Sequence, residues 1–240
     1  MVPSRLLVTD LDGTLVGDGE ALRAFLAWWR KARSDVRLVY NTARTWPSAQ
    51  GLLRSHGLPW PDAVVTGLGT EIRFRRGGPP DPAWAGRMAA RWDRRAVMAI
   101  AASLGSRLVP QPSIAQGPHK ASFEVADPAD ALRFLDRLLG ARLWVHAGLT
   151  QERFVDVIPF LAGKGAATAH LRLRFGISAG RTMTIGDSEN DLGMLSRPGP
   201  AIAVGNASPG LLGMLGSHVY RAPSAAAAGI LEGLRHFGWR

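Results

Sequence analysis

The chain has 240 residues, of which 46% are hydrophobic and 20% charged, as is ordinary for a globular protein with a core domain and a modest insertion. It contains no cysteine, which excludes disulfides, thiolate nucleophiles and cysteine metal ligands and leaves histidine or oxygen ligands for a metal. The formal net charge is +10, but 26 of the 29 basic residues are arginine and they are dispersed, which indicates a coding bias and a solvated surface, so we expect no nucleic-acid partner.

Short apolar runs alternate with longer amphipathic stretches in the first third of the chain, a rhythm typical of βα units and a mostly parallel sheet. The apolar spacing i, i+3, i+4, i+7 marks a helix with one buried face. The predicted elements are, in order, a strand at 5–9, a helix built on Leu22, Phe25, Leu26 and Trp29, a strand at 36–40, a helix at 47–55 and a strand at 63–66.

The cluster Gly77-Gly78-Pro79-Pro80 interrupts this rhythm, and Pro159 and Gly163 close the segment that follows. Between them the pattern is that of an inserted α+β segment. Its predicted elements are a helix at 82–103, a strand at 121–125, a helix at 128–139 and strands near 142–146 and 154–157.

The βα rhythm then returns and continues to the end of the chain. The predicted elements are a helix at 165–175, a strand at 182–185, a helix at 190–195, a strand at 201–204 and a helix at 224–236. The predicted fold class is therefore α/β, with a Rossmann-like, doubly wound parallel sheet as a discontinuous core and an inserted α+β cap. The expected limits are 1–77 and 160–240 for the core and 78–159 for the cap.

Polar side chains gather where the predicted strands end, and ligands bind there in open α/β sheets. Asp10 and Asp12 follow the first strand, and two carboxylates at i, i+2 can divide a nucleophile role and an acid/base role. For this pattern alone, a turn that merely ends a strand is an equal alternative. Thr42 and Ala43 follow the second strand, where a hydroxyl and backbone N–H groups can cradle phosphate, although a threonine that caps the next helix explains them too.

Two more motifs follow the insertion. Lys164 opens a predicted helix, where an ammonium could neutralise a phosphoryl oxygen; a surface lysine is the alternative, but lysine is rare in this chain. Asp187 and Asp191 lie at i, i+4 around a helix start and offer oxygen ligands that suit Mg²⁺, although such residues also stabilise a helix by themselves. Each signal alone is weak, whereas the four motifs in this order are highly specific.

Together these motifs resemble the signature motifs of the haloacid dehalogenase superfamily, and the position of the insertion resembles that of its type C2 cap. The pair Ile158-Pro159, followed by Gly163-Lys164-Gly165, is similar to the Cof-type branch of the capped enzymes. The resemblance extends through nearly the whole chain. It implies a Mg²⁺-dependent phosphoric monoester hydrolase.

Within that branch, the chain most resembles the sucrose-phosphate phosphatase group. The likeness rests on residues 11–18 (LDGTLVGD) and on Gly69-Thr70-Glu71-Ile72. In the cap it rests on Gln116 and on the pair His119-Lys120, which precedes the strand at 121–125. His119 departs from the tryptophan usual in that group, and Ala43 departs from the glycine that the superfamily favours.

The resemblance implies that Asp10 attacks phosphorus, while Asp12 protonates the leaving sugar oxygen and then activates water. The implied Mg²⁺ ligands are Asp10, the Asp12 main-chain carbonyl, Asp187 and Asp191. The implied phosphate ligands are Thr42, the Ala43 N–H, Lys164 and Asn190. The implied sugar ligands are Gly69, Thr70, Glu71, Gln116 and Lys120. His119 and Trp84 are candidates for stacking against the sugar ring, and ordinary packing within the cap is the alternative role for both.

A sugar phosphate is the expected small-molecule partner, and a disaccharide phosphate like sucrose 6-phosphate is the first choice. Mannosylfructose phosphate, a hexose phosphate and a phosphorylated polyol are alternatives, and a phosphosugar mutase shares the core and the cap type. A non-catalytic sugar-phosphate sensor is a further alternative, but it would have no need of both Asp10 and Asp12. We expect a cytoplasmic location and no membrane partner, because the first strand starts at Arg5 and no apolar run approaches the ~20 residues of a membrane span. A monomer or weak homodimer is expected.

Overall fold

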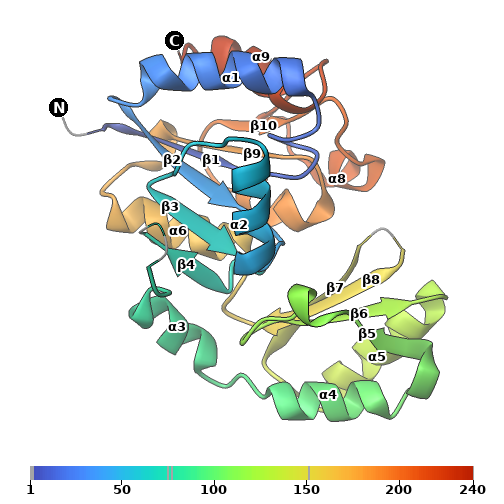
Figure 1. Cartoon of the computed structure of the whole chain (residues 1–240). Coiled ribbons are helices and arrows are strands. Elements are labelled where there is room, and N and C mark those ends of the chain that lie inside the picture. Colours follow the sequence, from blue (N-terminus) through green and yellow to red (C-terminus); the bar gives the residue numbers. More distant parts are fainter. Residues whose placement is uncertain (1–2, 75, 77, 151, 240) are drawn as a thin grey trace.

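The structure is a computed structural model that describes residues 3–74, 76, 78–150 and 152–239. Within these residues, seven strands form a first sheet in the order β11-β10-β9-β1-β2-β3-β4 (Figure 1). Its neighbours pair in parallel except β3 and β4, which are antiparallel. The strands are β1 (Arg5–Thr9), β2 (Val36–Asn41), β3 (Ala63–Thr66), β4 (Glu71–Arg73), β9 (Thr182–Gly186), β10 (Ala201–Ala203) and β11 (Val219–Arg221).

Helices cover both faces of the first sheet. Leu7 of β1 packs into one apolar cluster, whereas Leu6 and Val8 pack into the other, because successive side chains of a strand point to opposite faces. This explains why the run at 5–9 is apolar without alternation. One face is covered by α1 (Gly19–Ala32), α2 (Trp46–Ser55) and α9 (Ala226–His236), and the other by α3 (Pro82–Ala89), α6 (Lys164–Arg174), α7 (Leu192–Leu195) and α8 (Pro209–Met214).

The inserted segment forms a second sheet, antiparallel throughout, in the order β5-β6-β8-β7. Phe123 of this sheet meets Phe134 of a helix edge to face, with ring centroids 5.2 Å apart, in a third apolar cluster. The helices lie on the side of the sheet away from the first sheet (Figure 1), so the opposite face is turned toward the core. The elements are α4 (Arg94–Ala102), β5 (Leu108–Pro110), β6 (Ala121–Val125), α5 (Pro128–Gly140), β7 (Val145–Thr150) and β8 (Phe154–Pro159).

The helix predicted at 82–103 is wrong in its extent, since the structure has α3 and α4 with a break between them. Arg91 in the break has a φ of 62°, a conformation that does not continue a helix. The two helices also serve different sheets: Trp84 and Met88 of α3 are buried against the first sheet, and Val97 of α4 against the second. The domain limits at 78–159 stay a prediction, and residue 77 lies outside the described residues.

Several short elements differ from the sequence expectations. The strand expected near 142–146 is β7 at Val145–Thr150, and the helix expected at 190–195 is a 3₁₀ turn at Glu189–Asp191 followed by α7. Sequence patterns did not predict β4, β5, β11 or α8, each of six residues or fewer. None of the helices described is both long and apolar enough to cross a membrane.

Candidate active site

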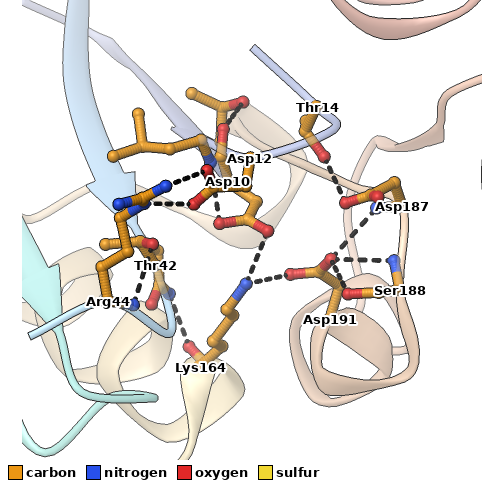
Figure 2. A network of polar contacts seen from close by, with 12 residues as sticks. Asp10, Asp12, Thr14, Thr42, Arg44, Lys164, Asp187, Ser188 and Asp191 are labelled. Atoms are coloured by element: carbon orange, nitrogen blue, oxygen red, sulfur yellow. Dashed lines mark hydrogen bonds and ion pairs between the residues drawn. The ribbon is translucent and has the colours of Figure 1, made fainter. Parts of the chain in front are cut away.

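The carboxyl ends of three neighbouring strands bring the predicted core motifs together (Figure 2). Asp10 follows β1, Thr42 follows β2, and Asp187 follows β9. Because β1 lies between β2 and β9 in a parallel arrangement, these three positions share one edge of the sheet. Gly13 makes the close approach possible: its φ is +70°, and a Cβ at this position would lie 2.4 Å from Asp187 Oδ2.

Three carboxylates form an acidic cluster at this edge. Asp10, Asp187 and Asp191 each offer one oxygen, and these oxygens lie within 4.8 Å of one another. Asp191 is fully buried, and its Oδ2 accepts the N–H groups of Asp187 at 3.0 Å and Ser188 at 3.1 Å. The Thr14 hydroxyl donates to Asp187 Oδ1 at 2.8 Å. The cluster is therefore held by local hydrogen bonds, and its oxygens are the hard ligands that divalent cations such as Mg²⁺ prefer.

Lys164 opposes the negative charge of this cluster from the start of α6. Its Nζ lies 2.9 Å from Asp10 Oδ2 and 2.7 Å from Asp191 Oδ1, and its side chain has no exposed surface. The Asn41 side-chain amide donates to the Lys164 carbonyl at 2.9 Å and fixes the backbone there. One ammonium balances only one of the three carboxylates, of which Asp10 and Asp191 are buried and Asp187 is partly buried, so the site still favours a cation.

The pKa values of the cluster follow from this imbalance. Burial raises the pKa of Asp10 to about 8; Lys164 lowers it, but Asp191 and Asp187 add to the rise. Burial and then Asp191 raise the pKa of Asp187 to about 6. Burial lowers the pKa of Lys164, but Asp10 and Asp191 outweigh it, and the pKa lies above its ordinary value. Both carboxylates therefore bind protons more strongly than a free aspartate does, and a cation would compete with those protons.

Asp12 is held by a residue that the sequence analysis did not select. Arg44 places Nε 2.7 Å from Asp12 Oδ2 and Nη2 2.7 Å from Asp12 Oδ1, a bidentate ion pair (Figure 2). Arg44 ends the same turn as Thr42 and Ala43. The motif contained it, but nothing in the sequence indicated that its side chain would reach across to Asp12.

A cleft of about 530 Å³ lies between this edge and the open face of the second sheet. The predicted residues that line it are Asp10, Asp12, Thr42, Ala43, Lys120, Asp187 and Asn190. The residues that sequence reasoning missed include Gln111, Thr150, Phe154, Asp156, Glu189 and Ser208. Phe154 and Asp156 alternate along β8 with the buried Val155 and Val157, so the period-two pattern of that strand was the available signal.

Lys120 reaches from the second sheet to the first. Its Nζ lies 3.1 Å from Asp156 Oδ1 and donates to the Ala43 carbonyl at 3.2 Å, and only 7% of its side chain is exposed. The Thr45 hydroxyl makes a second contact between the two parts, to the Ile114 carbonyl at 2.5 Å. Lys120 therefore joins the turn that carries Thr42 and Ala43 to the inserted sheet.

Gln116 lies in the loop between β5 and β6, and its side-chain amide is fully engaged. Its Oε1 accepts from Arg94 at 3.0 Å and from the Ser122 N–H at 3.1 Å, while its Nε2 donates to the carbonyls of Gln111 at 3.0 Å and Ser122 at 2.7 Å. These bonds shape the loop before β6. Gln111 of the same loop is the glutamine that lines the cleft.

Gly69, Thr70 and Glu71 are not among the described residues that line the cleft. Gly69 has a φ of +86°, and a Cβ there would lie 2.3 Å from the Gly163 carbonyl oxygen, so the two turns pack backbone against backbone. The Glu71 carboxylate accepts from Arg73 Nε at 2.7 Å. Burial lowers the pKa of His119. The negative charge of Glu71 opposes this change, but the pKa stays below its ordinary value.

Trp84 does not face the cleft. It is 1% exposed, its Nε1 donates to the Gly69 carbonyl at 3.1 Å, and its ring centroid lies 4.7 Å from that of His170 on α6. Packing of α3 on the first sheet accounts for this tryptophan.

Comparison with known proteins extends over nearly the whole chain. The sequence model of the family described as sucrose-6F-phosphate phosphohydrolase matches residues 3–238. The chain is 30% identical over 244 residues to a mannosylfructose-phosphate phosphatase of Agrobacterium fabrum, covering 99% of this chain and 98% of the relative. It is 32% identical to the probable sucrose-phosphatase 3b of Arabidopsis thaliana, of which it spans 60%.

One solved structure matches the chain almost end to end. It is the sucrose-phosphatase of Synechocystis sp. PCC6803 in complex with sucrose and phosphate, with a TM-score of 0.92 and 32% identity. The match covers 98% of both chains. The first sheet, the second sheet and their connections are thus shared with that protein.

Proposed function

The chain belongs to the sucrose-6F-phosphate phosphohydrolase family, and from that premise we propose that it hydrolyses a disaccharide phosphate of the sucrose 6-phosphate class. The expected membership of the haloacid dehalogenase superfamily and the expected α/β fold with an inserted cap are confirmed. The chain is a phosphoric monoester hydrolase that acts on a sugar phosphate. The observation that carries the proposal is the buried Lys164 between Asp10 and Asp191, together with a cleft that Asp10 lines along with residues of the inserted segment.

We assign the nucleophile role to Asp10. Its carboxylate attacks phosphorus, the bond from phosphorus to the sugar oxygen breaks, and Asp12 gives a proton to that oxygen. In the second half, water attacks the phosphorus of the aspartyl phosphate, Asp12 takes a proton from the water, and the bond to Asp10 breaks. Leu11 N–H donates to Asp10 Oδ1 at 2.7 Å and Lys164 contacts Oδ2, so both oxygens are oriented before the reaction.

We assign the binding of the phosphoryl oxygens to residues of the turn after β2 and of the neighbouring helix starts. The Arg44 N–H donates to the Thr42 hydroxyl oxygen at 3.1 Å, which leaves the hydroxyl proton free to donate to phosphate. Asn190 lines the cleft, and its side-chain amide could donate through Nδ2 to a phosphoryl oxygen. Lys164, Thr42, the Ala43 N–H and Asn190 together would surround the phosphoryl group, and such positioning supplies most of what phosphoryl transfer needs.

The acidic cluster fits a divalent cation, and we propose Mg²⁺. Asp10, Asp187 and Asp191 present oxygen donors within 4.8 Å of one another, and burial with one ammonium leaves their charge unbalanced. Together with the Asp12 carbonyl, they are the residues that would hold the ion. When bound, Mg²⁺ offsets the charge of the phosphate as it approaches the carboxylates.

The second sheet is proposed to bind the sugar. The cleft volume of about 530 Å³ lies within the range of small-molecule sites. Lys120, Gln111 and Asp156 line the cleft from the inserted segment, so we keep Lys120 as a sugar ligand and add the other two. Gly69, Thr70, Glu71 and Gln116 stay predictions; the internal hydrogen bonds of Gln116 support a loop-shaping role for that residue.

The test is a phosphate-release screen with Mg²⁺ over sucrose 6-phosphate, mannosylfructose phosphate, hexose phosphates, polyol phosphates and p-nitrophenyl phosphate. We expect the highest kcat/KM for a disaccharide phosphate. A mutase would instead return phosphate to the sugar, and phosphorus NMR of the products distinguishes this. Release from hexose monophosphates alone would overturn the disaccharide assignment. A cytoplasmic location and a monomer or weak homodimer stay predictions from the sequence.

A further inference from the structure

The ion pair between Arg44 and Asp12 has no part in the roles assigned above. We propose that Arg44 is a positioning residue, which holds the Asp12 carboxylate in the orientation that both proton transfers require; this rests on the proposed phosphatase function. The alternative is that Arg44 is a direct phosphate ligand in the same turn as Thr42 and Ala43. The contacts favour the first role.

Asp12 depends on Arg44 for its orientation. About half of the Asp12 side chain, 49%, is exposed, so packing does not fix its rotamer. Both of its oxygens accept from Arg44 at 2.7 Å, and two parallel N–H···O bonds fix both the distance and the rotation of a carboxylate. Among the described residues, Arg44 is the one that donates hydrogen bonds to this carboxylate. Without it, the carboxylate would turn freely toward water.

Arg44 is itself well anchored. Its Nη1 donates to the Ser48 hydroxyl on α2 at 2.8 Å, its N–H donates to Thr42, and its carbonyl accepts the Gly67 N–H at 2.7 Å. The guanidinium thus uses three of its five N–H donors on Asp12 and Ser48, so contacts within the protein set its orientation. Because these contacts fix the position of the Arg44 guanidinium, they also fix the position of the Asp12 carboxylate that it binds.

Substitution of Arg44 should lower kcat and leave KM nearly unchanged. General acid–base catalysis contributes about 10²–10⁴-fold, and a carboxylate free to rotate keeps only part of it. We expect Arg44→Gln to lower kcat by about 10-fold to 100-fold while KM changes by less than about threefold. Arg44→Lys keeps the charge but loses the two parallel N–H donors of the guanidinium, so it should recover little of the lost kcat. An exposed ion pair contributes little to stability, so the melting temperature should stay nearly unchanged.

The deciding experiment is a double-mutant cycle of Arg44→Gln and Asp12→Asn, measured with a disaccharide phosphate and with p-nitrophenyl phosphate. If Arg44 acts through Asp12, Arg44→Gln in the Asp12→Asn background should cost less than about twofold. Arg37→Gln is the matched control, since Arg37 pairs with Asp62 at 2.8 Å through a partly exposed guanidinium in β2, away from the cleft, and should keep full activity.

Two results would overturn the inference: losses that multiply in the double variant, which would make Arg44 a phosphate ligand, or an unchanged kcat in Arg44→Gln. Failure of the proposed function has a different signature. In that case the unaltered chain would release no phosphate from any ester, or Asp10→Asn would retain its activity, whatever the result for Arg44.

Discussion

Mg²⁺ binding to the acidic cluster should release about one proton near pH 7. In the metal-free protein the pKa of Asp10 is raised to about 8 by burial, and that of Asp187 to about 6. At pH 7 Asp10 therefore holds its proton most of the time, whereas Asp187 is mostly ionised. A cation requires the ionised carboxylates, so its binding displaces the proton of Asp10.

The pH dependence follows from the same two groups. Proton release should fall toward zero above pH 8 and exceed one below pH 6, where Asp187 also holds a proton. The apparent Mg²⁺ affinity should rise by about tenfold per pH unit between pH 6 and 8, as expected for one displaced proton. Both folded-state pKa values lie above the unfolded value of 3.8, so the native metal-free protein binds more protons than the unfolded chain. Its stability should therefore fall as pH rises from about 4 to 8, and saturating Mg²⁺ should reduce this fall.

Isothermal titration calorimetry in buffers with different ionisation enthalpies measures the proton count directly. Thermal melts from pH 5 to 8.5, with and without Mg²⁺, measure the stability effect. Asp10→Asn is the control, because it removes the proton that is displaced and should reduce release at pH 7 to well below one. Flat Mg²⁺ affinity from pH 6 to 8.5, with no proton release, would contradict the argument and show that Lys164 keeps Asp10 ionised.

Three further predictions concern turnover. Asp10→Asn should abolish phosphate release while the circular dichroism melt stays close to that of the unaltered chain; activity above a few per cent would remove Asp10 from the nucleophile role. EDTA should remove activity and Mg²⁺ restore it, whereas Ca²⁺, which accepts more ligands in looser geometry, should not; full activity in EDTA would refute the metal assignment. Lys120→Ala should lower kcat/KM for the disaccharide phosphate by about 10-fold to 100-fold, and that for p-nitrophenyl phosphate much less, in steady-state assays. Equal losses on both would show that Lys120 serves the phosphate turn or the fold alone.

The core of the candidate site could be predicted from sequence because parallel topology does most of the assembly. Asp10, Thr42 and Asp187 are far apart in the chain, but each follows a strand, and parallel neighbours end at one edge. Periodicity and turn residues locate strand ends even when the strand order is unknown. The residues at those ends then meet with little dependence on the details of packing.

Contacts that cross between elements were not predictable in the same way. The apolar spacing of Trp84 and Met88 predicts a buried helix face, but it does not say which sheet buries it. Gln116 was selected by resemblance, and its saturation by Arg94 and Ser122 depends on the path of a loop. Arg44 was one of 26 arginines, and its reach to Asp12 depends on a rotamer.

Lys120 was selected from the sequence, but its contacts are known only from the structure. The family resemblance selected it, but its partners, Asp156 of β8 and the Ala43 carbonyl of the turn after β2, lie 36 and 77 positions away in opposite directions. An ammonium has three donors, and two are engaged here, so one remains for a sugar hydroxyl in the cleft. The same lysine can thus bind sugar and hold the phosphate turn to the inserted sheet. Loss of the first role affects the disaccharide phosphate alone, while loss of the second affects every ester. The ratio of the two losses in kcat/KM for Lys120→Ala therefore measures the relative weight of the sugar-binding role and the turn-holding role. Because Lys120 contacts the Ala43 carbonyl in the phosphate turn, the loss on p-nitrophenyl phosphate should be small but above zero.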